Sequence, residues 1–385
     1  MAKMEWEEWE EWDEWEVIER ILPSSWESKA KESGSLRRGR GFANAGQLLR
    51  VMMIHLVDGC SLRETAVRAA EGNLAQVSDV ALLKALRRCQ EWFRWMAQGL
   101  MQQWLTPWVM GAGARRIRVV DGSMISEPGS TGSNWRLHYS ATLPSLHCDE
   151  VLVTGPEVGE SFSRYTVQPG DLLIGDRGLA QRKGIRHVLD GGGEVIVRLN
   201  LTNVPLVDDQ GQRFNLLAHL RRLHGTKVGD WPVILVDEHG QVSGRVCAIK
   251  KSRAAAARAR KRAQQESSRK GHLVQEATLE AAGYIFVFTT LSAEQYPPAR
   301  VLELYRGRWQ VELAFTRLKS ILATGHLKKT DPLGAKAWLQ GKLLAAVIIE
   351  TLISLGERFS PWGYPLSEFA SALPVARDLA DEIPA

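Results

Sequence analysis

The sequence predicts an α/β protein, in which a mixed sheet flanked by helices carries a β-rich insertion and follows an all-helical N-terminal domain. Three observations support this fold class. Residues 43–105 show helical periodicity, residues 115–200 alternate short apolar strands with a helix, and residues 201–282 break that rhythm with hairpin-like segments. Strands connected by crossover helices are typical of mixed α/β sheets.

The composition excludes several classes of protein. The 385 residues are 44% hydrophobic, which suffices for a sizeable core, and the apolar runs are too short for a membrane span. The acidic N-terminus lacks the features of a secretory signal. The net charge of +5 is uneven, because residues 1–16 hold eight acidic side chains and one lysine, and the basic remainder suggests a polyanionic partner. Four separated cysteines without a CxxC pair indicate free thiols in a reducing cytoplasm: Cys60, Cys89, Cys148 and Cys247.

The N-terminal part divides into two segments. Residues 1–42 are expected to be an acidic, tryptophan-rich extension and linker, and residues 43–110 a helical domain that binds DNA. Ser61 and Glu64 have the spacing of a capping box, and Ser78 begins a second helix. Two short helices joined by a turn fit either a helix-turn-helix-like DNA-binding unit or a plain helical bundle.

The first part of the catalytic core is expected over residues 111–200. Strands are predicted at residues 116–120, 135–141, 150–154, 171–174 and 194–199. A helix over residues 180–189 is ended by three glycines at residues 191–193.

A β-rich insertion with a basic helix is expected over residues 201–282. A hairpin joins residues 233–236 to residues 244–249, and residues 250–270 form a basic helical stretch. The second part of the core, residues 283–355, begins with the strand 284–289 and continues with helices over 298–322 and 338–355. Residues 356–385 form a C-terminal tail.

The predicted helix over residues 298–322 carries an unusual stripe. At 100° per residue, four polar or aromatic residues share a strip about 60° wide beside an apolar face: Tyr305, Arg308, Glu312 and Lys319. A helix with one apolar face needs only one polar face, and this helix has two. Glu312 between two cations is therefore either part of a structural ion pair or an active-site ligand.

Two aspartates accompany this glutamate. Asp121 and Asp176 each follow a predicted strand, a position that opens onto a cleft in α/β sheets. Three carboxylates converging on one cleft would repel each other unless a cation joins them, and all-oxygen ligands suit Mg²⁺ or Mn²⁺. Two such ions about 4 Å apart support phosphodiester cleavage and strand transfer.

These residues resemble the motifs of a known family. The segment from Tyr305 to Lys319 is similar to the Y-(2)-R-(3)-E-(6)-K signature of bacterial insertion-sequence transposases of the insertion-sequence-four family. Residues 119–123 (VVDGS) resemble the first-aspartate motif of that family, and residues 174–179 (IGDRGL) resemble the second. The similarity covers roughly residues 45–350.

The resemblance implies an RNase H-like catalytic core and Mg²⁺-dependent cut-and-paste transposition, with Mn²⁺ as a substitute and with end cleavage through a DNA hairpin. It makes Asp121, Asp176 and Glu312 the catalytic residues and metal ligands. It implies double-stranded DNA at inverted repeats and target DNA as partners, a homodimer on paired ends, and a place on the bacterial nucleoid. Residues expected to contact DNA are Tyr305, Arg308, Lys319, Trp231 (as the platform for a flipped base), Lys250, Lys251 and Arg253.

The sequence contains no motif for other common catalytic mechanisms. The sequence has no HExxH zinc site, no GxSxG elbow and no Walker-type phosphate loop. Two alternatives stay open. One is a truncated or decayed transposase that only binds DNA, and the other is a metal-dependent nuclease that cuts without rejoining.

Overall fold

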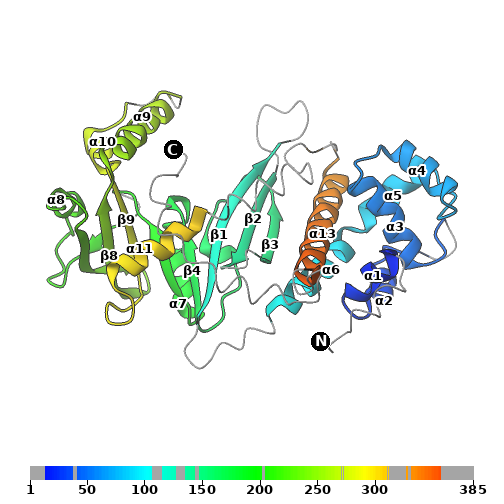
Figure 1. Cartoon of the computed structure of the whole chain (residues 1–385), viewed down its shortest axis with the longest axis horizontal. Coiled ribbons are helices and arrows are strands. Elements are labelled where there is room, and N and C mark those ends of the chain that lie inside the picture. The colour runs from blue at the N-terminus through cyan, green and yellow to red at the C-terminus, as the bar shows by residue number, and fades with distance from the viewer. Residues whose placement is uncertain are drawn as a thin grey trace.

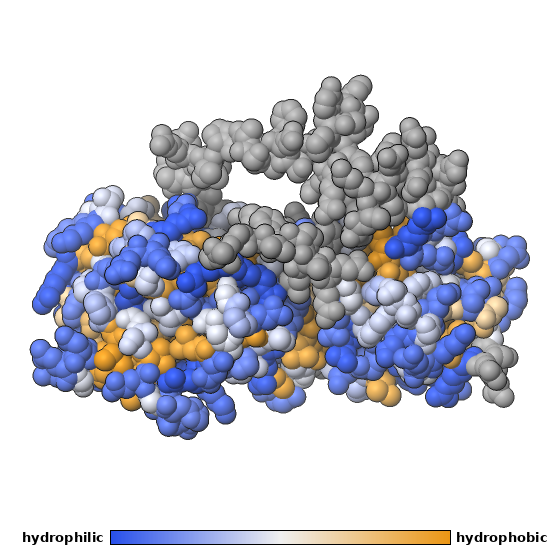
Figure 2. All heavy atoms as spheres, turned by 90° about the horizontal axis from the view of Figure 1, so that it is seen from below, coloured by the Kyte–Doolittle hydropathy of each residue, from blue (hydrophilic) through white to orange (hydrophobic). Residues whose placement is uncertain are grey.

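The computed structural model describes residues 14–37, 41–105, 115–126, 135–143, 147–201, 204–269, 271, 273–309, 311, 327 and 331–356. A helical bundle forms one end, a large sheet occupies the middle, and the helices of the insertion lie at the other end (Figure 1). None of the described helices is long and apolar enough to cross a bilayer. On the face seen in Figure 2, hydrophilic side chains surround smaller apolar patches.

In the part of the chain that the structure describes, the helical bundle contains six N-terminal helices and one from much later in the sequence. The predicted helix starts are confirmed, since the Ser61 hydroxyl accepts a hydrogen bond from the Glu64 amide and Ser78 caps its helix in the same way. The buried Trp92 ring stacks on Trp26 with 6.1 Å between centroids. The later helix, α13, packs on α3, α5 and α6 (Figure 1). The helices are α1 (Glu14–Ile21), α2 (Trp26–Glu32), α3 (Ala45–Leu56), α4 (Leu62–Glu71), α5 (Asp79–Arg88), α6 (Gln90–Leu105) and α13 (Pro332–Gly356).

Within the described residues, nine strands form one mixed sheet in the order β3-β2-β1-β4-β5-β9-β8-β7-β6. The first three strands are antiparallel, and β4 and β5 run parallel to β1, which is the arrangement expected of an RNase H-like core. The remaining strands are antiparallel. The strands are β1 (Arg116–Ile125), β2 (Trp135–Thr142), β3 (Cys148–Thr154), β4 (Asp171–Gly175), β5 (Glu194–Arg198), β6 (Leu206–Val207), β7 (Val228–Asp237), β8 (Gly240–Lys250) and β9 (Tyr284–Thr289).

The insertion extends this sheet. The predicted hairpin is confirmed as β7 and β8, with Asp237 opposite Gly240 at its turn, and β9 joins it to β5. The predicted basic helix is also confirmed, as α9 at the end of the molecule away from the bundle (Figure 1). The helical elements around this part of the sheet include α7 (Arg182–Asp190), α8 (Leu216–Arg221), α9 (Arg253–Arg269), α10 (Glu276–Ala281) and the 3-10 turn η2 (Phe162–Arg164).

Two predicted elements differ in their bounds. The first core strand was expected to end before Asp121, but β1 continues to Ile125 because β2 pairs with it along its whole second half. The helix expected over residues 298–322 begins as α11 (Pro298–Arg306) and passes at Gly307 into the 3-10 turn η4 (Gly307–Trp309). The ideal α-helical positions predicted for the stripe therefore do not hold at Arg308.

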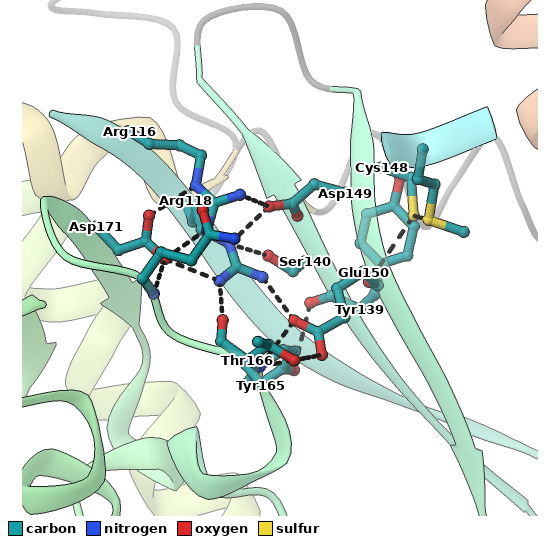
Figure 3. Close-up of polar contacts among 12 residues, drawn as sticks. Arg116, Arg118, Tyr139, Ser140, Cys148, Asp149, Glu150, Tyr165, Thr166 and Asp171 are labelled. Carbon is teal, nitrogen blue, oxygen red and sulfur yellow. Dashed lines mark hydrogen bonds and ion pairs between the residues drawn. The ribbon is translucent and has the colours of Figure 1, made fainter. Parts of the chain in front are cut away.

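A buried charge network fixes the strands that carry the site (Figure 3). Arg118 on β1 is 1% exposed and lies among acids from two other elements. Its guanidinium pairs with Asp149 at 2.6 Å and Glu150 at 2.8 Å on β3, and with Asp171 at 3.3 Å at the start of β4. Arg116 forms a second, shorter pair with Asp171 at 2.6 Å. The network therefore holds β1 to β3 and β4 just before the strands reach the site.

Candidate active site

Two aspartates lie level with each other on neighbouring parallel strands. Val119 of β1 lies opposite Ile174 of β4, so Asp121 and Asp176, each two residues further along, reach the same edge of the sheet. Asp176 directly follows β4 and caps the 3-10 turn η3 (Arg177–Leu179), where its side chain accepts a 2.7 Å hydrogen bond from the Gly178 amide. The topology thus brings together two acids that are far apart in the sequence.

A third acid, Glu160, joins them from the loop between β3 and η2. One carboxylate oxygen from each of Asp121, Glu160 and Asp176 lies within 4.8 Å of the other two. Two glycines make room for Glu160, because a Cβ on Gly122 would lie 2.6 Å from its Oε1 and a Cβ on Gly178 would lie 2.7 Å from its Oε2. The sequence analysis missed Glu160, since no motif marks it. The only sequence feature connected with Glu160 is the pair of glycines, Gly122 and Gly178, which the sequence pattern alone indicates as turn residues.

Burial and mutual repulsion disfavour the charged form of these acids. Burial is the main cause that raises the pKa of Asp121 to about 6; the charges of Asp176 and Glu160 also raise it, whereas the hydrogen bond from the Gly122 amide and the charge of Arg308 lower it. Burial and the Asp176 charge also raise the pKa of Glu160. A divalent cation would relieve this repulsion, and an all-oxygen ligand set suits a hard cation. The three acids therefore fit a divalent metal ion.

One residue of the predicted stripe lies beside the acids, and a second contacts a neighbouring arginine. Arg308 in η4 approaches Asp121 with 3.4 Å between Nη1 and Oδ2. Tyr305, near the end of α11, is buried and forms a side-chain hydrogen bond with Arg198 at the end of β5. Arg198 was missed by the sequence analysis, because a charged residue closing a predicted strand carries no special pattern.

Lys251 adds a further cation on the insertion side. Its Nζ donates a 2.9 Å hydrogen bond to the Ala282 carbonyl oxygen, and the side chain is half-buried. Burial, followed by repulsion from Arg198, Arg177 and Arg262, lowers the pKa of Lys251 to about 8. Arg198 likewise has a lowered pKa through burial and through Arg177 and Arg308. Cations that repel each other in this way form a site suited to an anion such as a phosphate.

The remaining predicted site residues lie elsewhere. Lys250 and Arg253 are exposed on either side of Lys251. Trp231 on β7 is half-buried, and its ring contacts His219 edge-on at 5.3 Å between centroids. Glu312 and Lys319 fall outside the described residues.

Comparison with known proteins identifies the family. A family model described as "Transposase DDE domain" matches residues 154–348, a span that contains Glu160, Asp176 and Glu312, and Asp121 precedes it. The chain belongs to the DDE transposase family. Such transposases are enzymes that cleave and transfer DNA phosphodiesters, and they use divalent metal ions, which agrees with the acid cluster.

Two relatives extend the match over most of the chain. The chain is 34% identical over 346 residues to the putative transposase InsL of insertion sequence element IS186A from Escherichia coli (strain K12), covering 88% of this chain and 93% of that protein. It is 33% identical over 347 residues to the transposase of insertion sequence element IS421 from Escherichia coli, with the same coverage. A piggyBac transposase in a synaptic complex with hairpin DNA gives a TM-score of 0.45 at 7% identity, over 87% of this chain and 72% of that one.

Proposed function

We propose that this transposase cuts and rejoins DNA at the ends of an insertion sequence, with Asp121, Asp176 and Glu312 as its catalytic metal ligands. The observation that carries the proposal is the meeting of Asp121 and Asp176 in one acid cluster beside Arg308, whose charge also acts on Arg198. Glu312 is included because its spacing from Tyr305 and Arg308 matches the family signature.

The metal proposed for this site is Mg²⁺, with Mn²⁺ as a substitute, because both take carboxylate oxygens. When bound, these ions supply the acidity that activates a water or 3′-hydroxyl and stabilises the departing oxygen. The carboxylates of Asp121 and Asp176 hold the metal at the sheet edge. The guanidinium of Arg308 lies close enough to Asp121 to bind the phosphate being attacked.

A second phosphate position is proposed at Arg198 and Lys251. Tyr305 holds the Arg198 guanidinium by a hydrogen bond, and Lys251 approaches from the insertion. A DNA phosphate would offset the repulsion between these cations and would favour the protonated form of Lys251. Lys319 is proposed as a further phosphate contact on the basis of the signature.

The wider DNA interface extends over other parts of the chain. Lys250, Arg253 and the exposed arginines of α9 are proposed to follow the DNA backbone, and Trp231 to stack on a flipped base. The helical part over residues 43–110 is proposed to bind the inverted repeats. The proposed assembly is a homodimer on paired ends that captures target DNA on the bacterial nucleoid in the cytoplasm.

The proposal is tested with a supercoiled plasmid that carries the two element ends. Asp121→Asn, Asp176→Asn and Glu312→Gln should each reduce cleavage in Mg²⁺ by about 100-fold or more, the scale seen when a main stabiliser of a transition state is removed. End binding, measured by gel shift, should persist. The exposed Asp209→Asn serves as the matched control and should cut normally.

Three outcomes decide between the candidates. Normal cleavage by Asp121→Asn or Asp176→Asn would refute the assigned site. A wild-type protein that binds ends but never cuts in Mg²⁺ or Mn²⁺ would be a DNA-binding protein only. Cleavage without joined product would indicate a nuclease.

A further inference from the structure

Glu160 occupies a position that the family signature does not account for. We propose that its carboxylate is an additional ligand of the divalent metal, beside Asp121 and Asp176. This inference rests on the proposed function of the site, and it adds a residue from the β3–η2 loop to the acids that the sequence motifs supply.

The distances fit a shared ion. An oxygen of Glu160 lies within 4.8 Å of one oxygen from each aspartate. Ligand oxygens on opposite sides of one Mg²⁺ are about 4.2 Å apart, given metal–oxygen distances near 2.1 Å. A small side-chain rotation therefore suffices to place all three oxygens around one ion.

Among the described residues, the Glu160 carboxylate has no hydrogen-bond or ion-pair partner that explains its position. Within the described part of the chain it accepts no hydrogen bond and forms no ion pair, although Asp176 and Asp121 both stand beside it. Of the cations in the described part of the chain, Arg136 acts on it electrostatically, and that side chain donates its own hydrogen bond to the Val158 carbonyl at 3.1 Å. A half-buried carboxylate placed against two others without compensation is costly unless a cation is bound.

The backbone around Glu160 is held in place. The Gln181 amide donates to the Glu160 carbonyl at 2.9 Å and to the Gly178 carbonyl at 3.0 Å, which ties this loop to the turn after Asp176. Gly122 and Gly178 lie on either side of the carboxylate, and a side chain at either position would collide with it. Both aspartate motifs therefore contain a glycine whose missing side chain leaves space for Glu160.

The test measures metal binding by the full-length protein without DNA. Mn²⁺ is titrated by calorimetry, and the melting temperature is followed with and without Mn²⁺. Glu160→Gln should weaken Mn²⁺ binding by about 10-fold or more, the scale of loss reported for residues that support a metal site. The same variant should melt at a higher temperature than wild type in the absence of metal, because one of three repelling charges is gone. Glu157→Gln, an exposed acid on the same loop, is the control and should match wild type in both measurements.

A second variant tests the role of Glu160 in metal binding without altering a carboxylate. Gly122→Ala should displace Glu160 and weaken Mn²⁺ binding in the same direction, since its Cβ would lie 2.6 Å from Oε1. Unchanged Mn²⁺ affinity in Glu160→Gln would overturn the inference. A fall in the metal-free melting temperature of that variant would also overturn it, because it would show a structural role. Unchanged affinity in Asp121→Asn would instead remove the proposed metal site as a whole.

Discussion

The first half of β1 and the segment around Asp121 both place charges in the protein interior. In the first half of β1 these charges are paired with opposite charges, whereas around Asp121 most of them are not. At Arg118, two arginines meet three acids, and each charge faces an opposite one at 3.3 Å or less (Figure 3). At Asp121, three acids converge with one arginine at 3.4 Å. A compensated network stabilises the fold, whereas an uncompensated cluster is arranged to receive a cation.

This comparison predicts opposite effects on stability when one charge is removed. Arg118→Met removes the nearest cation of Asp149 and Glu150 and one of the two arginines that pair with Asp171, and it should lower the free energy of unfolding by about 3–5 kcal/mol. The loss is measured by urea unfolding at neutral pH. Arg116→Met, whose side chain is 23% exposed, is the matched control and should cost clearly less. If the two variants lost the same free energy of unfolding, the burial of Arg118 would not be the reason that the network stabilises the fold.

Asp121→Asn should have the reverse effect in the metal-free protein. The pKa of Asp121 is raised from 3.8 to about 6, so its contribution to stability is present below pH 4 and is lost as the pH rises through 6. That difference corresponds to about 3 kcal/mol. Wild type in EDTA should therefore lose stability relative to Asp121→Asn between pH 4 and pH 7. A constant difference between the two proteins across this range would contradict the uncompensated cluster.

The sequence predicted the parts of the site that local patterns determine. Asp176 follows a short apolar strand, and the actual strand ends at Gly175 as the pattern indicated. The capped helices and the β7–β8 hairpin also follow local signals, since a cap or a tight turn is recognised within a few residues. The fold class and the meeting of the two aspartates were predictable because each aspartate directly follows an apolar stretch, and these two stretches pair as neighbouring parallel strands, although β1 continues past Asp121.

Contacts between distant segments were not predictable in the same way. Glu160 joins the cluster because a loop crosses the end of the sheet, and Arg118 is buried because acids arrive from β3 and the start of β4. A strand pattern gives the direction of a side chain but not its partners. A 3-10 turn begins at Gly307, where the pattern predicts a continuous α-helix. The sequence pattern therefore identified the stripe residues but did not predict the directions in which their side chains point.

The last prediction concerns the cationic side of the site, where the expected effect is smallest. Because the pKa of Lys251 is lowered to about 8, its protonated form is largely lost in the free protein at pH 9. A DNA phosphate binds the protonated form, so affinity for end DNA should fall about tenfold between pH 7 and pH 9. Lys251→Arg should remove most of this pH dependence, since arginine stays charged throughout. The exposed Lys250→Arg is the matched control and should keep the dependence of wild type. Equal pH profiles for wild type and Lys251→Arg, measured by fluorescence anisotropy at constant salt, would remove Lys251 from the phosphate site and leave Arg198 and Arg308 as the cations beside the acids.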